Sequence, residues 1–165
     1  MNSLETERLV LEPLVPAHAA KLFPYLRDPQ LYEFLDSEPP KSVAILLTQY
    51  RRWEPRRSPD GSQSWLNWAA RALSGEYVGW FQATVYPDGR ADLAYLVFSG
   101  FQRRGYAIEA CRSVVGHLKV EYRIRALRAT IHPANEASIS LARRLGLTQT
   151  SEVGRDLRFE ANILE

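Results

Sequence analysis

The segment FQRRGYAIEA, residues 101–110, combines glycine and positive charge at the point where a strand-like pattern gives way to a helical one. The first turn of a helix has backbone N–H groups without partners, and glycine lets an anion approach them because it has no Cβ. Gly105 and Ala107 meet this need, and Arg103 and Arg104 add positive charge. The segment predicts an anion site suited to a diphosphate, and a solvated turn around a tight bend is the alternative.

Other motifs for chemistry are weak. Neither the G-x-G-x-x-G dinucleotide fingerprint nor the P-loop pattern occurs, and no serine lies in a nucleophile elbow. The three histidines are scattered along the chain, which favours surface or locally hydrogen-bonded roles and predicts no metal site. Cys111 lies in an apolar helical stripe, so we expect a buried structural thiol rather than a nucleophile.

The overall charge excludes some classes of partner. The chain has 21 basic and 19 acidic residues, a balance that does not favour nucleic acid or a membrane surface.

The longest aliphatic run of the chain, residues 43–47, is far shorter than the ~20 residues that cross a bilayer, and the start MNSLETERL lacks the apolar region of a signal peptide. These features predict a cytoplasmic protein, and the length predicts a single domain over residues 1–165.

The elements that must position residues 101–110 predict a mixed α/β (α+β) fold. Period-2 patterns indicate about seven strands, and apolar spacings of three and four indicate about four helices. Three consecutive antiparallel strands precede the segment, so we expect a single, mostly antiparallel central sheet. The strands are expected at about 7–14, 64–73, 76–87, 91–98, 125–132, 147–152 and 154–163. The helices are expected at about 16–27, with a short second helical piece at 28–36, and at about 41–53, 107–122 and 135–145.

Three segments, QRRGYA, TERLVLEPL and HPANEASISLARRLGL, together resemble the GNAT superfamily of N-acetyltransferases. QRRGYA, preceded by an apolar strand, resembles the acyl-coenzyme A (CoA) signature Q/R-x-x-G-x-G/A of that superfamily. TERLVLEPL and HPANEASISLARRLGL resemble its Rim-type branch, which contains the ribosomal-protein N-terminal acetyltransferases. The resemblance covers nearly the whole chain in the expected order, and it implies the GNAT fold with acetyl-CoA as co-substrate and no metal.

The resemblance also implies which residues bind the coenzyme. Backbone amides of the signature would hold the pyrophosphate, and the end of the fourth strand would pair with the pantetheine amides where the sheet splays open. One N–H group at that strand end would stabilise the oxyanion. The residues implied are Gln102, Arg103, Arg104, Gly105, Tyr106 and Ala107 for the pyrophosphate, and Leu96, Val97 and Phe98 for the pantetheine.

Catalytic roles follow from the same resemblance. Asp92 occupies the position of a glutamate that deprotonates the amine through water, and an outward-facing strand aspartate is the alternative. Asn135 and Ser138 match an N-x-x-S element in which asparagine contacts the pantetheine and serine protonates the leaving thiolate. The same pair is also typical of a helix N-cap. Ala142 stands where many relatives have a tyrosine acid, which leaves Ser138 or water as the proton donor.

We therefore expect an acetyl-CoA-dependent N-acetyltransferase that acts on a protein N-terminal amine or a small-molecule primary amine. The competing hypothesis is a noncatalytic acyl-CoA-binding or sensing domain. The expected partners are acetyl-CoA and the amine acceptor, without nucleic acid or membrane, and a homodimer is left open. Aromatic residues near the expected acceptor entrance belong either to the core or to the pocket: Tyr32, Phe34, Trp53, Trp65, Trp68 and Trp80.

Overall fold

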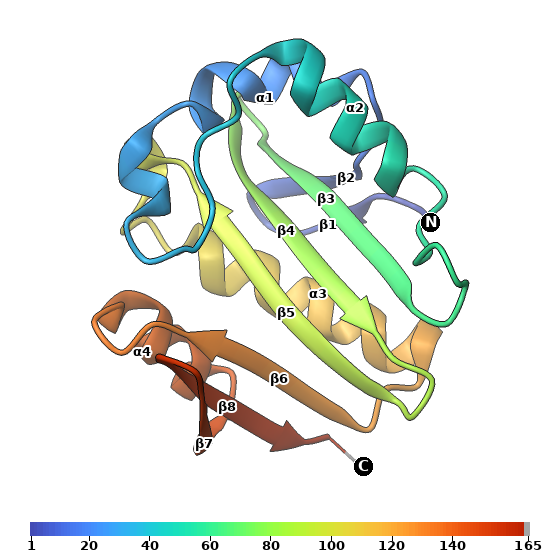
Figure 1. The fold of residues 1–165 in the computed structure, drawn as a ribbon, viewed down its shortest axis with the longest axis vertical. Coiled ribbons are helices and arrows are strands. Elements are labelled where there is room, and N and C mark those ends of the chain that lie inside the picture. The colour runs from blue at the N-terminus through green and yellow to red at the C-terminus, as the bar shows by residue number, and fades with distance from the viewer. Residues whose placement is uncertain (164–165) are drawn as a thin grey trace.

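The computed structural model describes residues 1–163, which build one eight-stranded sheet with helices on both faces (Figure 1). The strand order is β1-β2-β3-β4-β5-β6-β8-β7, and every neighbouring pair is antiparallel except β5 and β6. The predicted mixed, mostly antiparallel sheet is confirmed, with one short strand more than expected. The strands are β1 (Leu4–Glu5), β2 (Leu9–Pro13), β3 (Ser64–Ala72), β4 (Tyr77–Val85), β5 (Arg90–Val97), β6 (Ala126–Ile131), β7 (Thr148–Val153) and β8 (Asp156–Asn162).

Two layers of helices cover the sheet. On one face lie α1 (His18–Leu26), the 3-10 turn η1 (Pro29–Tyr32) and α2 (Val43–Trp53). On the other lie α3 (Tyr106–Tyr122) and α4 (Glu136–Arg144), whose apolar residues join the larger core cluster (Figure 1). The helix expected at 28–36 is only the η1 turn, which begins at a proline and is capped by the side chain of Asp28.

The sheet opens between its two parallel strands. Pairing of β5 with β6 runs only from Arg90 opposite Ala126 to Asp92 opposite Arg128. Beyond that point β5 continues to pair with β4, and β6 continues to pair with β8 as far as Ile131. The two strands therefore diverge on the side where β5 leads into α3.

The core explains several apolar positions in the sequence. Cys111 is completely buried on the inner face of α3, which confirms the predicted structural thiol, and burial raises its pKa. Trp68 is also completely buried, and it packs in the cluster beneath α3. Trp53 stacks on Trp80 at 5.7 Å on the opposite face, where α2 packs. These tryptophans serve the packing of the two layers.

Candidate active site

The predicted anion site lies at the start of α3. Gly105 is the N-cap residue, with φ of 80°, and the helix has no side-chain cap at this end. The first carbonyl to accept a helical hydrogen bond is that of Gly105, from Glu109 N–H, so the amides before Glu109 precede the helical ladder. Arg103 also has a positive φ, of 61°. Left-handed residues at such short spacing are typical of the concave backbone segments that bind anions.

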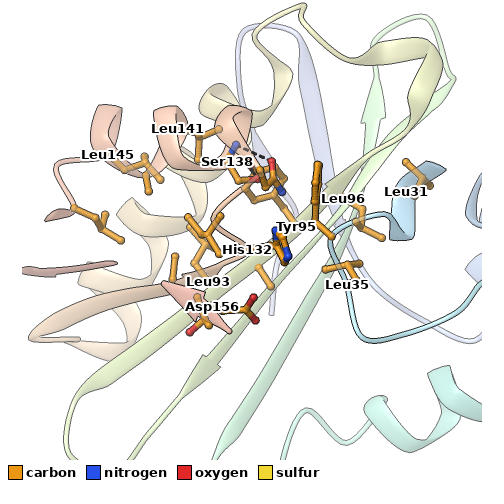
Figure 2. Close-up of a pocket in the computed structure, with 18 of the residues that line it drawn as sticks. Leu31, Leu35, Leu93, Tyr95, Leu96, His132, Ser138, Leu141, Leu145 and Asp156 are labelled. Atoms are coloured by element: carbon orange, nitrogen blue, oxygen red, sulfur yellow. Dashed lines mark hydrogen bonds between the residues drawn. The ribbon is translucent and has the colours of Figure 1, made fainter. Parts of the chain in front are cut away.

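A cavity of about 190 Å³ fills the opening between β5 and β6. Its walls come from those two strands, from α4 and from the segment that follows η1 (Figure 2). Mostly apolar side chains line it, and a few polar groups converge on it, which is the usual composition of a small-molecule site. The polar lining residues that matter below are Tyr95, His132, Asn135, Ser138 and Asp156.

Two hydroxyl groups meet in this cavity. Tyr95 reaches across from β5, and its hydroxyl lies 3.0 Å from Oγ of Ser138 on α4 (Figure 2). Burial raises the pKa of Tyr95 to about 12, although the hydrogen bond with Ser138 opposes the rise. The phenol is therefore protonated at neutral pH and can donate a proton. Sequence reasoning missed Tyr95, although strand alternation places it on the same face as Leu93 and Val97, beneath α4.

Asn135 performs the capping role that its spacing to Ser138 allows. Its Oδ1 accepts the backbone N–H of Ser138 at 3.2 Å, which fixes the start of α4. Asn135 also lines the cavity. Its predicted contact with pantetheine stays a prediction, and capping does not prevent it because the cap uses only the oxygen.

At the end of β5, the backbone N–H and C=O groups of every second residue point toward the opening. Phe98 N–H donates to Val78 at 2.9 Å, and the Phe98 carbonyl accepts from Phe101 at 2.8 Å, so both groups are used within the protein. Since alternate residues of a strand point their backbone groups to opposite neighbours, Leu96 points to β4 as Phe98 does, and Val97 points to the opening. The Val97 carbonyl already accepts from the Gln102 side chain at 3.0 Å, which leaves its N–H as the group best placed for a ligand.

The two aspartates near the opening differ in their contacts. Asp92 is bound by Arg128 through Nε at 2.6 Å and Nη2 at 3.0 Å, and by the Tyr86 hydroxyl at 2.8 Å. It lies where β5 and β6 are still paired, three residues before Tyr95, or about 10 Å along the strand. The structure therefore does not bring Asp92 together with Ser138, and the catalytic role of Asp92 stays a prediction that these contacts do not favour.

Asp156, at the start of β8, is a carboxylate that sequence reasoning missed. It lines the cavity, and its buried Oδ1 has no hydrogen-bond partner among residues 1–163. The nearest cation is Arg155, whose Nε lies 4.0 Å from that oxygen. Figure 2 shows Asp156 and Ser138 at opposite ends of the cavity, with His132 between them. Only the pairing of β8 with β6 brings this residue to the opening, so no local motif could have identified it.

The histidines make local contacts. Nδ1 of His132 accepts the backbone N–H of Ala134 at 3.1 Å, and its ring stacks on Phe34 at 5.5 Å within the cavity wall. Nδ1 of His18 accepts the N–H of Val15. Among residues 1–163, no group of three or more histidine, cysteine or acidic side chains is arranged to hold a metal ion.

Comparison with known proteins identifies the family. The profile described as "Acetyltransferase (GNAT) domain" matches residues 8–148, which is most of the chain. The chain belongs to the GNAT acetyltransferase family. None of the curated protein sequences matches this GNAT chain significantly. Among residues 1–163, no helix is long and apolar enough to span a bilayer.

Solved structures share the fold of this GNAT chain at low sequence identity. RimL, a ribosomal L7/L12 alpha-N-protein acetyltransferase solved with CoA, has a TM-score of 0.83 at 17% identity, over 98% of each chain. A GNAT acetyltransferase from Bacillus anthracis has a TM-score of 0.80 at 12% identity, over 97% of this chain and 98% of that one. Spermidine N-acetyltransferase from Vibrio cholerae, solved with CoA and spermine, has a TM-score of 0.78 at 13% identity, over 93% and 95% of the two chains.

Proposed function

We propose that this GNAT chain is an acetyl-CoA-dependent N-acetyltransferase of the Rim type that acetylates a primary amine, either a protein N-terminal amine or a small-molecule amine. The pair of hydroxyls formed by Tyr95 and Ser138 carries the proposal, because it lies in the opening of the sheet. The uncapped start of α3 provides the diphosphate site. The family membership and the overall likeness to RimL support the same assignment.

The proposed reaction is a direct transfer. The neutral amine attacks the thioester carbonyl carbon, so that a C–N bond forms and, as the tetrahedral species collapses, the C–S bond breaks. The N–H of Val97 is the proposed donor to the oxyanion, since it points into the opening. The departing thiolate takes a proton from the hydroxyl of Ser138. Tyr95 can then return a proton to Ser138 through the hydrogen bond between the two hydroxyls. The nitrogen loses its extra proton to water or to a carboxylate.

Asp156 is the proposed anchor for the acceptor amine. A buried carboxylate oxygen without a hydrogen-bond partner favours a ligand that donates a hydrogen bond to it, as an amine does, because leaving such an acceptor unsatisfied is costly. The apolar wall that includes Leu31, Phe34 and Leu35 lies beside the same cavity and would contact the rest of the acceptor. This arrangement suits an amine attached to an apolar group.

A panel of amines tests the proposal. The full chain is incubated with acetyl-CoA and either N-terminal peptides or small primary amines, and thiol release and product mass are measured. We expect release of one thiol for each acetylated amine with at least one class of acceptor. Stabilisation by CoA in a thermal-shift experiment, without thiol release from any amine, would instead support a noncatalytic sensing domain. Absence of any CoA binding would contradict the proposal as a whole.

A further inference from the structure

The N-terminal segment Thr6–Leu9 contacts the start of α3, about a hundred residues later in the chain. The carboxylate of Glu109, in the first turns of that helix, accepts from the Thr6 hydroxyl at 2.6 Å and from the Arg8 backbone N–H at 2.8 Å. The Arg8 side chain adds Nε at 2.7 Å and Nη2 at 2.7 Å. Two segments that are separate in the sequence, TERL and GYAIEA, therefore form one hydrogen-bonded unit.

Arg8 also reaches the signature loop itself. Its Nη1 donates to the backbone carbonyl of Arg104 at 2.9 Å, and its guanidinium lies 4.7 Å from the ring centroid of Tyr106. A Cβ on Gly105 would lie 3.3 Å from Nη2 of Arg8. A single planar side chain thus contacts Arg104 and Tyr106, on either side of Gly105, as well as Glu109, which a lysine could not do.

The contact with the Arg104 carbonyl determines where the next amide points. The carbonyl of Arg104 and the N–H of Gly105 belong to one planar trans peptide, in which the two groups point in opposite directions. Because Arg8 holds the carbonyl, the Gly105 N–H points away from Arg8. The Gly105 amide is therefore available to an anion that binds at the helix start, on the side of the loop opposite to Arg8.

Arg8 also compensates a charge. Burial opposes ionisation of Glu109, but hydrogen bonds from Thr6 and Arg8 outweigh it and lower the pKa of Glu109. An ionised carboxylate in the first turns of α3 would repel a diphosphate bound at the same helix end. The guanidinium pairs with this carboxylate and cancels most of that repulsion.

We propose that Arg8 is a positioning residue for the diphosphate of acetyl-CoA, which it assists by orienting the Gly105 amide and by neutralising Glu109. The inference rests on the proposed function, because the diphosphate is that of the proposed substrate. It assigns a role to the TERL segment, which no step of the reaction uses.

Two acetyl donors separate this role from a merely structural one. Arg8→Ala is assayed with acetyl-CoA and with S-acetylpantetheine, which lacks the diphosphate. We expect KM for acetyl-CoA and the dissociation constant for CoA to rise about tenfold, with kcat little changed. For S-acetylpantetheine, kcat/KM should remain near the wild-type value. Arg112→Ala, which removes the same charge from an exposed position on α3, is the control and should leave both donors unaffected.

A charge rescue tests the second half of the proposal. Glu109→Gln in the Arg8→Ala background should recover part of the lost CoA affinity, because it removes the uncompensated carboxylate. Arg8→Lys, which keeps the charge without the planar fork, should lose less affinity than Arg8→Ala and serves if the alanine variant does not fold. Equal losses with both donors, or a double variant that binds CoA no better than Arg8→Ala, would overturn the inference while leaving wild-type acetyl transfer intact. Wild-type protein that binds no CoA would refute the proposed function itself.

Discussion

The gap between β5 and β6 has a closed end and an open end, and both contain polar side chains. At the closed end, Asp92 receives two hydrogen bonds from Arg128 and one from Tyr86, and the strands are still paired. At the open end, the hydroxyls of Tyr95 and Ser138 share a single hydrogen bond, and the strands have separated. Strand β5 thus contributes Asp92 to a saturated cluster at one end and Tyr95 to an unsaturated one at the other.

This difference shows what a binding site requires beyond the right residue types. A carboxylate whose oxygens are already bound by a guanidinium and a phenol has little capacity left for a substrate. Each hydroxyl at the open end still has an unused donor or acceptor position. Its position in the strand therefore makes Asp92 a candidate catalytic base. Its hydrogen bonds with Arg128, however, indicate that it holds β5 and β6 together.

The largest effect is expected from a change at the predicted diphosphate site, at the start of α3 beyond the open end. Gly105→Glu introduces a side chain at a φ of 80° and a negative charge at the anion site. We expect the affinity for CoA to fall about 100-fold or more by titration calorimetry, because the diphosphate is excluded. Gly116→Glu is the matched control, since a Cβ at this exposed position of α3 contacts nothing within 4 Å. Unchanged affinity in Gly105→Glu would refute the placement of the diphosphate.

The next effect concerns the two hydroxyls at the open end. Ser138→Ala and Tyr95→Phe should each lower kcat about tenfold, and the double variant should lose little more, because the two hydroxyls act in one proton relay to the thiolate. The dissociation constant of CoA should change by no more than about twofold, since neither variant alters the diphosphate site. Loss of CoA affinity without loss of kcat would show that the pair binds the coenzyme and does not donate the proton.

At the closed end we expect a loss of stability in place of a loss of turnover. Asp92→Asn leaves the Arg128 guanidinium, whose side chain is 8% exposed, without its charged partner. The free energy of unfolding should fall by about 1–3 kcal/mol in urea denaturation, with kcat little changed. Asp88→Asn, which affects an exposed pair with Arg90, should cost less. A large drop in kcat with unchanged stability would restore Asp92 as the catalytic base.

The smallest effect is expected from pH, because kcat should not depend on the ionisation of Tyr95 below pH 10. Burial raises the pKa of Tyr95 from 10.0 to about 12, so the neutral phenol and its stabilising contribution persist below pH 10 and are lost only as the pH rises toward 12. Tyr95 should therefore cause no decline of kcat up to pH 10. An alkaline decline below that pH that disappears in Tyr95→Phe would contradict the proposed environment of this phenol.

Much of the architecture was predictable because it depends on local periodicity. Alternation in ADLAYLVF indicated β5, and the apolar spacing around Cys111 indicated α3 with its buried face. Strand β1, with only two residues, was missed because so short a segment shows no alternation. The N-cap role of Asn135 was one of two predicted roles, and the structure confirms it.

The sequence by itself was enough to predict an anion site at residues 101–110 and to show the family resemblance, because glycine, charge and helix periodicity act within a few residues. Only the tertiary structure decided which groups share the site. Tyr95 meets Ser138 because β5 separates from β6, Asp156 reaches the cavity because β8 pairs with β6, and Arg8 reaches Arg104 because β2 lies beside the start of α3. These contacts join residues far apart in the chain, so they depend on strand pairing and helix packing, which no local pattern specifies.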